Sequence, residues 1–208
     1  MKNKSYIGIS FIILIFGIYV VPKIINKFKG NNLVQIGPAP KFELTNQNAK
    51  KISNKDYDGK VYVVEFFFST CPSICPIMNR NMIGIQNEFF GNSNFAIASI
   101  TINPEVDTPQ VLKAHAKTLG ITSANWHLLT GDNAYIMNLC NKGFNIYAAE
   151  NFKVNGGFEH QGYFALIDKK GMIRCRKDEQ GNPIMYYYGL EKSGVNAIKQ
   201  DIKLLLEE

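Results

Sequence analysis

Val61-Tyr-Val-Val-Glu-Phe-Phe-Phe-Ser-Thr-Cys71-Pro-Ser-Ile-Cys75-Pro-Ile-Met-Asn-Arg80 is the stretch that decides the fold. Its first eight residues are β-branched or aromatic apart from Glu65, which is typical of a buried central strand. The chain then breaks at Ser69-Thr70 into a Cys-x-x-x-Cys loop that carries two prolines. We therefore expect a buried strand that delivers two thiols, Cys71 and Cys75, to one point at its end.

The spacing of the two cysteines predicts a reactive pair. At i and i+4, both sulfurs project from one face if the segment forms the first turn of a helix. The free N–H groups and positive dipole at a helix start lower a thiol pKa and favour the thiolate. A thiolate is both a ligand for soft ions such as Cu(I) or Zn(II) and the nucleophile of disulfide exchange. Cys71 and Cys75 are therefore candidate metal ligands and candidate catalytic thiols, with buried structural cysteines as the alternative.

The first thirty residues form a separate segment. Tyr6 to Val21 are sixteen residues without a charge, and Ile24 and Ile25 extend the run if Lys23 snorkels. No small-residue cleavage site follows, so we expect a retained transmembrane anchor at residues 1–30, with a cleaved signal peptide as the alternative. Lysines flank both sides of the run, so the positive-inside rule barely decides its orientation.

The charge distribution supports this division. Six lysines precede the first acidic residue, Glu43, and residues 42–208 then hold 17 basic and 17 acidic side chains. A domain without excess positive charge lacks the basic surface that nucleic-acid binding requires, and the net positive charge of the chain comes from the anchor region only. Residues 31–40, with Gly37-Pro-Ala-Pro40, are expected to be a linker. Residues 41–208 are the length of one ordinary domain with its own core.

The rest of the chain alternates between strand and helix patterns. Asp107 or Thr108 can cap one of the helices, and Gly120 can end it. The expected helices cover 76–90, 109–119, 132–141 and 193–206; the expected strands cover 95–102 and 126–130; hairpins are expected over 42–52 and 163–175. This order predicts an α/β fold with a mixed β-sheet flanked by helices. The paired cysteines at the first strand-to-helix junction make the arrangement thioredoxin-like.

A third metal ligand has to come from one of three histidines. His115 lies within a predicted helix and is most simply a solvated or partly buried residue of one face. His127 lies in an apolar strand, where a core imidazole is the simpler interpretation. His160 lies in the loop Gly156-Gly-Phe-Glu-His-Gln-Gly162, which leads into a strand, and such loops commonly hold functional side chains. An imidazole joined to two thiolates would favour copper.

Several of these motifs together resemble the Sco/SenC family. They are Phe67-Phe-Ser-Thr-Cys-Pro-Ser-Ile-Cys-Pro76, Asn103-Pro-Glu-Val-Asp-Thr-Pro109, Trp126-His-Leu-Leu-Thr-Gly131 and Glu159-His160, in that order, before a Gly-Met-Ile-Arg hairpin. The resemblance spans roughly Pro40 to Leu206. Members commonly have Asp-Pro-Glu where this chain has Asn103-Pro-Glu, and Asp-His-Ser where it has Glu159-His-Gln161.

The resemblance implies a function as well as a fold. Members are membrane-anchored, thioredoxin-like copper chaperones that help to assemble the dinuclear copper centre of cytochrome c oxidase, and some reduce disulfides. It implies Cys71, Cys75 and His160 as the copper ligands and the copper-bearing oxidase subunit, or another copper or thiol protein, as the partner. It also implies a domain that faces the periplasm from the bacterial inner membrane.

Two further functions use the same thiols. A thiol-disulfide oxidoreductase would use Cys71 and Cys75 catalytically, although their spacing is one residue longer than Cys-x-x-Cys and no proline lies between Phe158 and Ile167. A peroxidase of this fold would not need the second cysteine. Cys140 and Cys175 lie outside the resemblance and are either buried single cysteines or a second disulfide.

Overall fold

The computed structural model describes residues 5–28 and 33–208, with side chains described from residue 10 to 21 and from 33 onward. The chain divides into two compact units, Met1–Asn32 and Leu33–Glu208. The first unit contains α1 (Ser5–Phe28). Among the residues described, no helix has both the length and the apolar character that a membrane crossing requires. The expected anchor, residues 1–30, reaches beyond the described residues at both of its ends.

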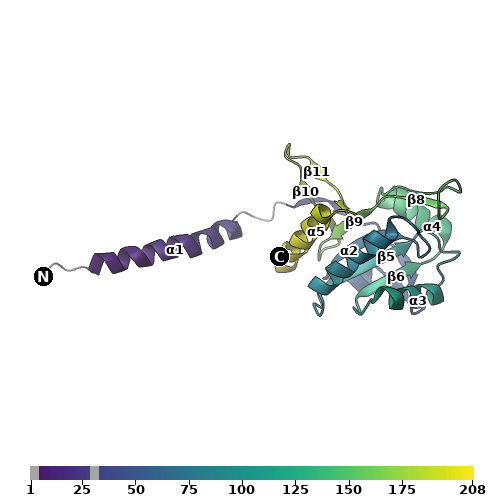
Figure 1. Ribbon diagram of the computed structural model, residues 1–208, viewed down its shortest axis with the longest axis horizontal. Coiled ribbons are helices and arrows are strands. Elements are labelled where there is room, and N and C mark those ends of the chain that lie inside the picture. The colour runs from purple at the N-terminus through teal and green to yellow at the C-terminus, as the bar shows by residue number, and fades with distance from the viewer. Residues whose placement is uncertain (1–4, 29–32) are drawn as a thin grey trace. The chain divides into compact units, whose positions relative to one another are not determined.

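The second unit is built on a mixed sheet, of which Figure 1 labels β5, β6, β9 and β10. The strands follow the order β1-β10-β9-β4-β5-β6-β2-β3. Three central strands, β4 (Val61–Phe67), β5 (Phe95–Thr101) and β6 (Trp126–Thr130), are parallel to one another. The strand β9 (Tyr163–Ile167) pairs antiparallel with β4, and β10 (Met172–Lys177) continues the sheet. This arrangement confirms the predicted α/β class with a mixed sheet flanked by helices.

The central strand is buried along its whole length, as its sequence predicts. Every residue of β4 and of β5 is buried, because the sheet continues on both sides of them and helices cover its faces. At the far edge, β2 (Glu43–Asn46) and β3 (Lys51–Ser53) form the expected hairpin, followed by a 3₁₀ turn, η1 (Asn54–Tyr57). The hairpin joins the sheet through pairing of β2 with β6.

The segment expected to be a linker contributes a strand. β1 (Val34–Pro38) pairs antiparallel with β10, with an irregularity between Gln35 and Gly37. A sequence with two prolines and a glycine gives little strand signal, but an edge strand tolerates proline because only one of its sides is hydrogen-bonded. The compact domain therefore begins at Leu33.

Three of the four helices, α2, α3 and α5, agree closely with their predicted ranges. The four are α2 (Cys75–Glu88), α3 (Pro109–Leu119), α4 (Asn133–Asn138) and α5 (Lys192–Glu207). Figure 1 shows α2 and α5 side by side, and Glu88 of α2 lies 3.1 Å from Lys199 Nζ and 2.5 Å from Lys203 Nζ of α5. α3 begins at the Thr108 cap and ends at Gly120, whose φ of 76° is the left-handed conformation that glycine adopts readily.

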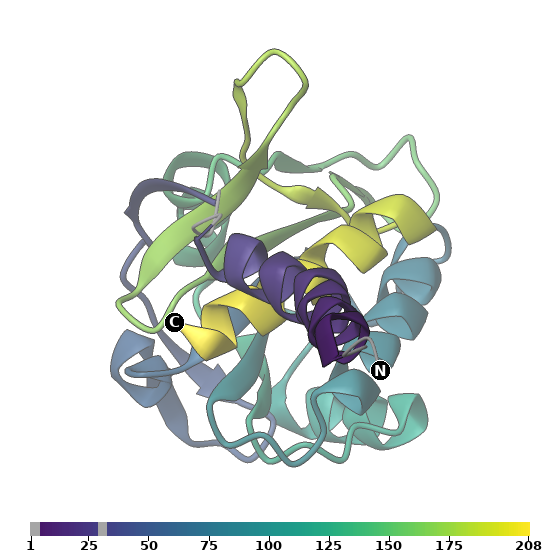
Figure 2. The ribbon, with the colours of Figure 1, turned by 90° about the vertical axis from the view of Figure 1, so that its left-hand side faces the viewer.

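The expected helix over 132–141 departs from the prediction. The α-helical part, α4, ends at Asn138 and continues as a π-helical turn, η2 (Leu139–Gly143). After it come β7 (Ala148–Glu150) and β8 (Phe158–His160), which pair with each other in a two-stranded ribbon separate from the main sheet. Short strands also follow the last hairpin: β11 (Pro183–Ile184) pairs with β10, and β12 (Tyr187–Tyr188) pairs with β9. Figure 2 shows the turn between β10 and β11 projecting from the domain.

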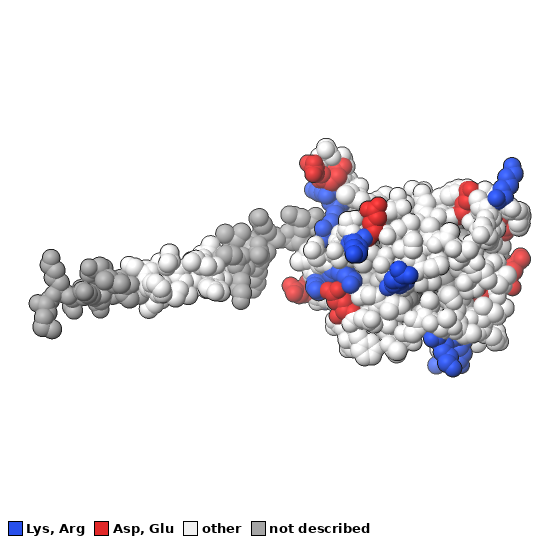
Figure 3. Space-filling model, in the orientation of Figure 1, with Lys and Arg blue, Asp and Glu red and all other residues white. Residues whose placement is uncertain are grey.

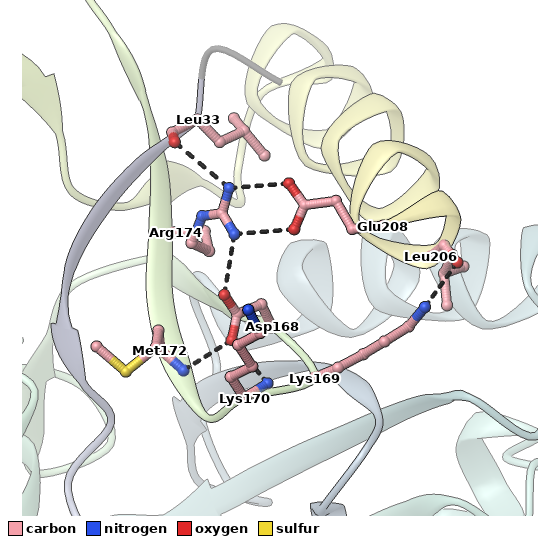
Figure 4. Close-up of polar contacts among 8 residues, drawn as sticks. All are labelled: Leu33, Asp168, Lys169, Lys170, Met172, Arg174, Leu206 and Glu208. Atoms are coloured by element: carbon pink, nitrogen blue, oxygen red, sulfur yellow. Dashed lines mark hydrogen bonds and ion pairs between the residues drawn. The ribbon is translucent and has the colours of Figure 1, made fainter. Parts of the chain in front are cut away.

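A cluster of polar contacts holds the start of the domain to its last helix (Figure 4). Arg174 of β10 donates to Asp168 at 2.9 Å, to both carboxylate oxygens of Glu208 at 3.0 Å, and to the carbonyl of Leu33 at 3.4 Å. Lys169 Nζ donates to the carbonyl of Leu206, in the last turn of α5, at 2.8 Å. One guanidinium therefore links the beginning of β1, the β9–β10 turn and the end of α5.

The surface of the domain carries mixed charges. On the face shown in Figure 3, most of the surface is uncharged, and the few basic and acidic side chains are scattered without a large patch of one sign. This agrees with the equal numbers of basic and acidic residues after position 41. The surface in view therefore offers no basic groove of the kind that binds nucleic acids.

Candidate metal centre

The two cysteines lie where β4 passes into α2. After Phe68 the backbone turns, and Cys71 N–H donates to the Phe68 carbonyl at 3.2 Å. Cys75 is the first residue of α2, with Pro76 in the first turn, where a missing N–H costs nothing. Cys75 N–H points at Cys71 Sγ at 3.5 Å. Cys71 is 8% exposed and Cys75 is 1% exposed, so the first sulfur is the more accessible of the two.

His160 reaches both sulfurs from a distant part of the chain. It is the last residue of β8, and its Nε2 lies 3.2 Å from Cys75 Sγ and 3.9 Å from Cys71 Sγ. The three ligand atoms all lie within 4.8 Å of one another, and these are the only three such residues grouped in this way within the described part of the chain. The structure therefore brings together the three residues that the sequence singled out.

The imidazole is oriented by packing. Its ring meets Phe68 edge-on with centroids 5.7 Å apart, and Phe158, also on β8, packs against the same Phe68 ring at 5.3 Å. Nδ1 of His160 is buried and has no hydrogen-bond partner among the described residues. Metal-binding histidines commonly have a hydrogen bond at the second nitrogen, so here the backbone and Phe68 must orient the ring instead.

The pKa values of the two thiols are shifted in opposite directions. The pKa of Cys71 is lowered to about 3, mainly because the Cys75 thiol donates to its sulfur, with His160 and the N–H groups of Cys75 and Ser73 adding to the effect against burial. The pKa of Cys75 is raised, mainly because its thiol is held by the Cys71 thiolate and because it is buried. The pair therefore holds one proton at neutral pH, and Cys71 is the thiolate.

A buried carboxylate supports the start of the cysteine loop. Asp107 is 0% exposed and accepts the Ser69 backbone N–H at 3.0 Å, the Ser69 hydroxyl and the Thr101 hydroxyl. Ser69 is two residues before Cys71, and Thr101 is the last residue of the neighbouring strand β5. Asp107 therefore joins the ends of two parallel strands at the start of the cysteine loop. From the sequence, Asp107 was expected only as a possible cap of α3. The cap is Thr108, whose hydroxyl accepts the Val111 N–H at 3.4 Å.

A second buried carboxyl was noticed only as an exception to the strand pattern. Glu65 in β4 is fully buried, and its Oε1 accepts the Ser99 hydroxyl at 2.6 Å, which in turn accepts the Trp126 indole N–H at 2.9 Å. Its Oε2 has no partner among the described residues. Burial raises the pKa of Glu65 to about 7. In the sequence, the only sign of this buried carboxyl group is an acidic residue within an otherwise apolar strand.

The remaining histidines and cysteines lie outside the cluster. His115 stacks on Phe67 at 5.8 Å, and burial lowers its pKa. His127 shares a 2.9 Å hydrogen bond with the Tyr57 hydroxyl, as expected of a core imidazole. Cys140 and Cys175 are both buried free thiols, so of the two alternatives the structure has single cysteines.

The donor set fits a soft metal ion. Two sulfurs, one of them a thiolate, and a neutral imidazole nitrogen are the ligands that copper(I) prefers, and carboxylates, which hard ions require, are absent from the cluster. Since no described residue completes a set of four, the cluster is not a closed structural zinc site. The geometry supports binding of one soft ion or closure of a dithiol to a disulfide.

Comparison with known proteins places the chain among a defined group. The family model described as SCO1/SenC matches residues 35–192. A SCO1 protein homolog of Bacillus subtilis is 30% identical over 166 residues, which is 78% of this chain and 79% of that protein. The crystal structure of a SCO1/SenC family lipoprotein from Bacillus anthracis is 27% identical, covers 85% of this chain and 99% of its own, and superposes with a TM-score of 0.73.

Two further structures have the same fold. BsSco, described as having a disulfide switch and as a member of the Sco family of cytochrome c oxidase assembly proteins, is 26% identical with a TM-score of 0.69, covering 82% of this chain and 95% of its own. Yeast Sco1, solved with copper bound, is 24% identical with a TM-score of 0.60, covering 81% of this chain and 90% of its own. These likenesses confirm the expected thioredoxin-like Sco fold.

Proposed function

This chain belongs to the SCO1/SenC family, and on that premise we propose that it is a metallochaperone whose Cys71, Cys75 and His160 together bind one copper ion. The observation that carries the proposal is the approach of His160 Nε2 to both sulfurs, 3.2 and 3.9 Å away, from a residue 85 positions beyond the second cysteine. A dithiol used only for disulfide exchange needs no imidazole at that place.

The protonation of the site suits the uptake of a cation. Because Cys71 is already a thiolate, the ion needs to displace a proton only from Cys75. His160 enters as a neutral imidazole through Nε2. Copper loading therefore releases about one proton from the thiol pair. Cys71 is the less deeply buried of the two cysteines, at 8% exposure against 1%, so its sulfur is the one that a recipient's ligands reach first, and transfer proceeds by exchange of ligands.

Oxidation of the thiols provides a control on loading. A disulfide between Cys71 and Cys75 would remove both sulfur ligands at once, and the two sulfurs lie within 4.8 Å of each other. The relative BsSco is described as having a disulfide switch. Copper binding by this chain thus requires the reduced pair.

The recipient follows from the family. BsSco is described as belonging to a family of cytochrome c oxidase assembly proteins, and we propose that this chain delivers copper to the dinuclear copper site of that oxidase, or keeps the thiols of that site reduced. The proposal includes attachment to the membrane through residues 1–30, with the domain in the periplasm. The uncharged run from Tyr6 to Val21 and the description of one relative as a lipoprotein support the attachment.

Replacing His160 tests the metal site. We expect His160→Ala to lower the affinity of the reduced chain for copper(I) by more than about a hundredfold, since even the loss of outer partners costs about 10–100-fold. The measurement is competition against a chromophoric copper(I) chelator. Oxidation of the dithiol should still proceed, and His127→Ala, which changes a core imidazole, is the matched control. Unchanged copper affinity in His160→Ala would show that the ligand assignment is wrong.

The lowered pKa of Cys71 supports a second candidate function. A thiolate next to a protonated thiol is also the starting state of a thiol-disulfide oxidoreductase. Turnover in a disulfide-reduction assay that persists in His160→Ala and disappears in Cys71→Ser would favour this function. Turnover that is slow in the unmodified chain, together with one copper ion bound per chain, would favour the metallochaperone.

A further inference from the structure

The ribbon that carries His160 is too small to hold its own position. β7 and β8 have three residues each and pair only with each other, apart from the main sheet. A two-stranded hairpin on its own is marginally stable in water. The loop that joins the strands touches the cysteine loop, since a Cβ at Gly156, whose φ is +95°, would lie 2.8 Å from Pro72 Cδ. Besides the packing of Phe158 and His160 on Phe68, the location of the imidazole therefore depends on what supports the outer edge of β7.

One side chain supplies that support. Asn141, in the π-helical turn η2, accepts the Ala148 N–H at 3.0 Å and donates to the Ala148 carbonyl at 2.8 Å. This pair of bonds has the pattern that a neighbouring strand would make with Ala148. The same Asn141 amide donates to the Met137 carbonyl of α4 at 3.1 Å. Figure 1 shows α4, which leads into η2, in the same part of the domain as β8.

The bonded residue lies directly opposite the ligand. Ala148 pairs with His160 across the ribbon. Because both backbone groups of Ala148 are directed to Asn141, this pair is of the type without hydrogen bonds between its members, in which side chains lie closest together. Ala148 is 2% exposed, so its side chain packs against the domain on the face that also holds the imidazole. A shift of Ala148 is therefore transmitted to His160.

The turn that holds Asn141 is fixed to the strand that delivers the cysteines. Phe144, directly after η2, is fully buried and meets Phe66 of β4 edge-on with ring centroids 5.7 Å apart. The Phe144 carbonyl also accepts the Tyr186 hydroxyl. One support thus runs from β4 through Phe144 and Asn141 to Ala148 and His160. The π-helical turn, a feature frequent at functional sites, presents Asn141 to the ribbon.

We propose that Asn141 is a positioning residue for copper binding, which acts by holding the β7–β8 ribbon so that His160 meets the two sulfurs. The inference rests on the proposed function, because it concerns the affinity of that same site. Nδ1 of His160 has no hydrogen bond within the described chain that could orient the ring independently, so the backbone and the packing on Phe68 carry this task. The Asn141 amide hydrogen-bonds to Met137 and Ala148 and not to the thiols or the imidazole, so Asn141 acts on the site indirectly.

A double-mutant cycle in the purified, reduced full chain tests the proposal. We expect Asn141→Ala to lower the copper(I) affinity about tenfold, in the range found for residues that orient metal ligands. In a chain that already carries His160→Ala, Asn141→Ala should lower the affinity no further, because its effect passes through the imidazole. With copper(II) as the probe, the nitrogen hyperfine coupling in the electron paramagnetic resonance spectrum should weaken in the single variant.

The controls separate positioning from stability. Asn125 is also half-buried and donates to two backbone carbonyls, those of Ser93 and Phe95, so Asn125→Ala should leave copper affinity unchanged. If Asn141→Ala does not fold, Asn141→Asp keeps the acceptor for Ala148 N–H and loses the donor, and the same cycle applies to it. An equal loss of affinity with and without His160 would overturn the proposal. If His160→Ala itself has no effect, the proposed function fails; if only Asn141 has none, this inference alone fails.

Discussion

Glu65 combines full burial with an incomplete set of hydrogen bonds. Only Oε1 is bonded, to Ser99, and the apolar surroundings raise the pKa of the carboxyl group to about 7. The chain therefore keeps Glu65 protonated at a pH where an exposed glutamate is ionised. At Cys71 burial also raises the pKa, but hydrogen bonds to the sulfur outweigh it and favour the charged form. Residue acidity in this domain is thus set by local partners and burial.

The protonation of Glu65 makes stability depend on pH. Its pKa is higher in the folded chain than the value near 4.5 in the unfolded chain, so the folded state binds more protons between pH 4.5 and 7. The contribution of Glu65 to stability is fully present below pH 4.5 and is lost as the pH rises through about 7. We expect Glu65→Gln to remove this dependence and to raise the free energy of unfolding at pH 8 by about 2–3 kcal/mol.

Urea denaturation of both chains between pH 4.5 and 8 measures the effect. Glu43→Gln, which changes an exposed carboxylate in β2, is the matched control and should leave the pH profile as it is. A Glu65→Gln chain that loses stability with rising pH as steeply as the unmodified chain would contradict this account.

At the scale of elements, the site lies where separate elements end. β4 delivers Ser69 and the cysteines, β5 delivers Thr101, the loop before α3 delivers Asp107, and the ribbon delivers His160. The carboxyl ends of parallel strands meet at one edge of a sheet, which is where ligands of α/β proteins bind. Asp107 joins two of these strand ends, so the loop 103–108 is part of the support of the cysteine loop.

Replacing Asp107 tests that support. Asp107→Asn keeps the shape of the side chain, but it has one acceptor oxygen where aspartate has two, and three donors point at them. We therefore expect the free energy of unfolding to fall by about 2 kcal/mol. The cysteine loop should also become more mobile, which hydrogen exchange at Ser69 N–H can measure. Glu105→Gln, an exposed carboxylate in the same loop, should have little effect on either quantity. Equal stability of the two variants would show that Asp107 does not support the loop.

At the scale of the whole molecule, the chain has a neutral domain and a basic first segment. The Arg174 cluster closes the domain, because it connects Leu33, the β9–β10 turn and Glu208 (Figure 4). The charges that make the chain basic all precede Glu43. This division allows the proposed membrane attachment and the metal chemistry to be tested separately.

Removal of residues 1–30 tests the proposed attachment. After cell fractionation, we expect the full chain in the membrane fraction and the shortened chain in the soluble fraction, because the uncharged run from Tyr6 to Val21 is gone. Detergent, but not high salt, should release the full chain, since salt disrupts only charge-based attachment. Release of the full chain by salt alone would contradict an apolar anchor.

The sequence alone determined the class of fold and the residues of the candidate site. The buried strand before Cys71, the i and i+4 spacing of the cysteines and the caps at Thr108 and Gly120 are local signals, and each describes a neighbourhood of a few residues. The motif around His160 was informative because it resembles a family. The strand at 34–38 gave no comparable signal, since an edge strand that ends in glycine and proline is held by its neighbour and not by its own propensity.

Only the tertiary structure decided how the parts meet. His160 and the two cysteines, Asp107 and its three donors, and Asn141 and Ala148, which share two hydrogen bonds, are all contacts between separate elements. The burial of Glu65 likewise depends on strands on both of its sides. Local sequence fixes the conformation of each element, whereas acidity, ligand geometry and support arise from contacts between elements, which the order of residues along the chain does not display.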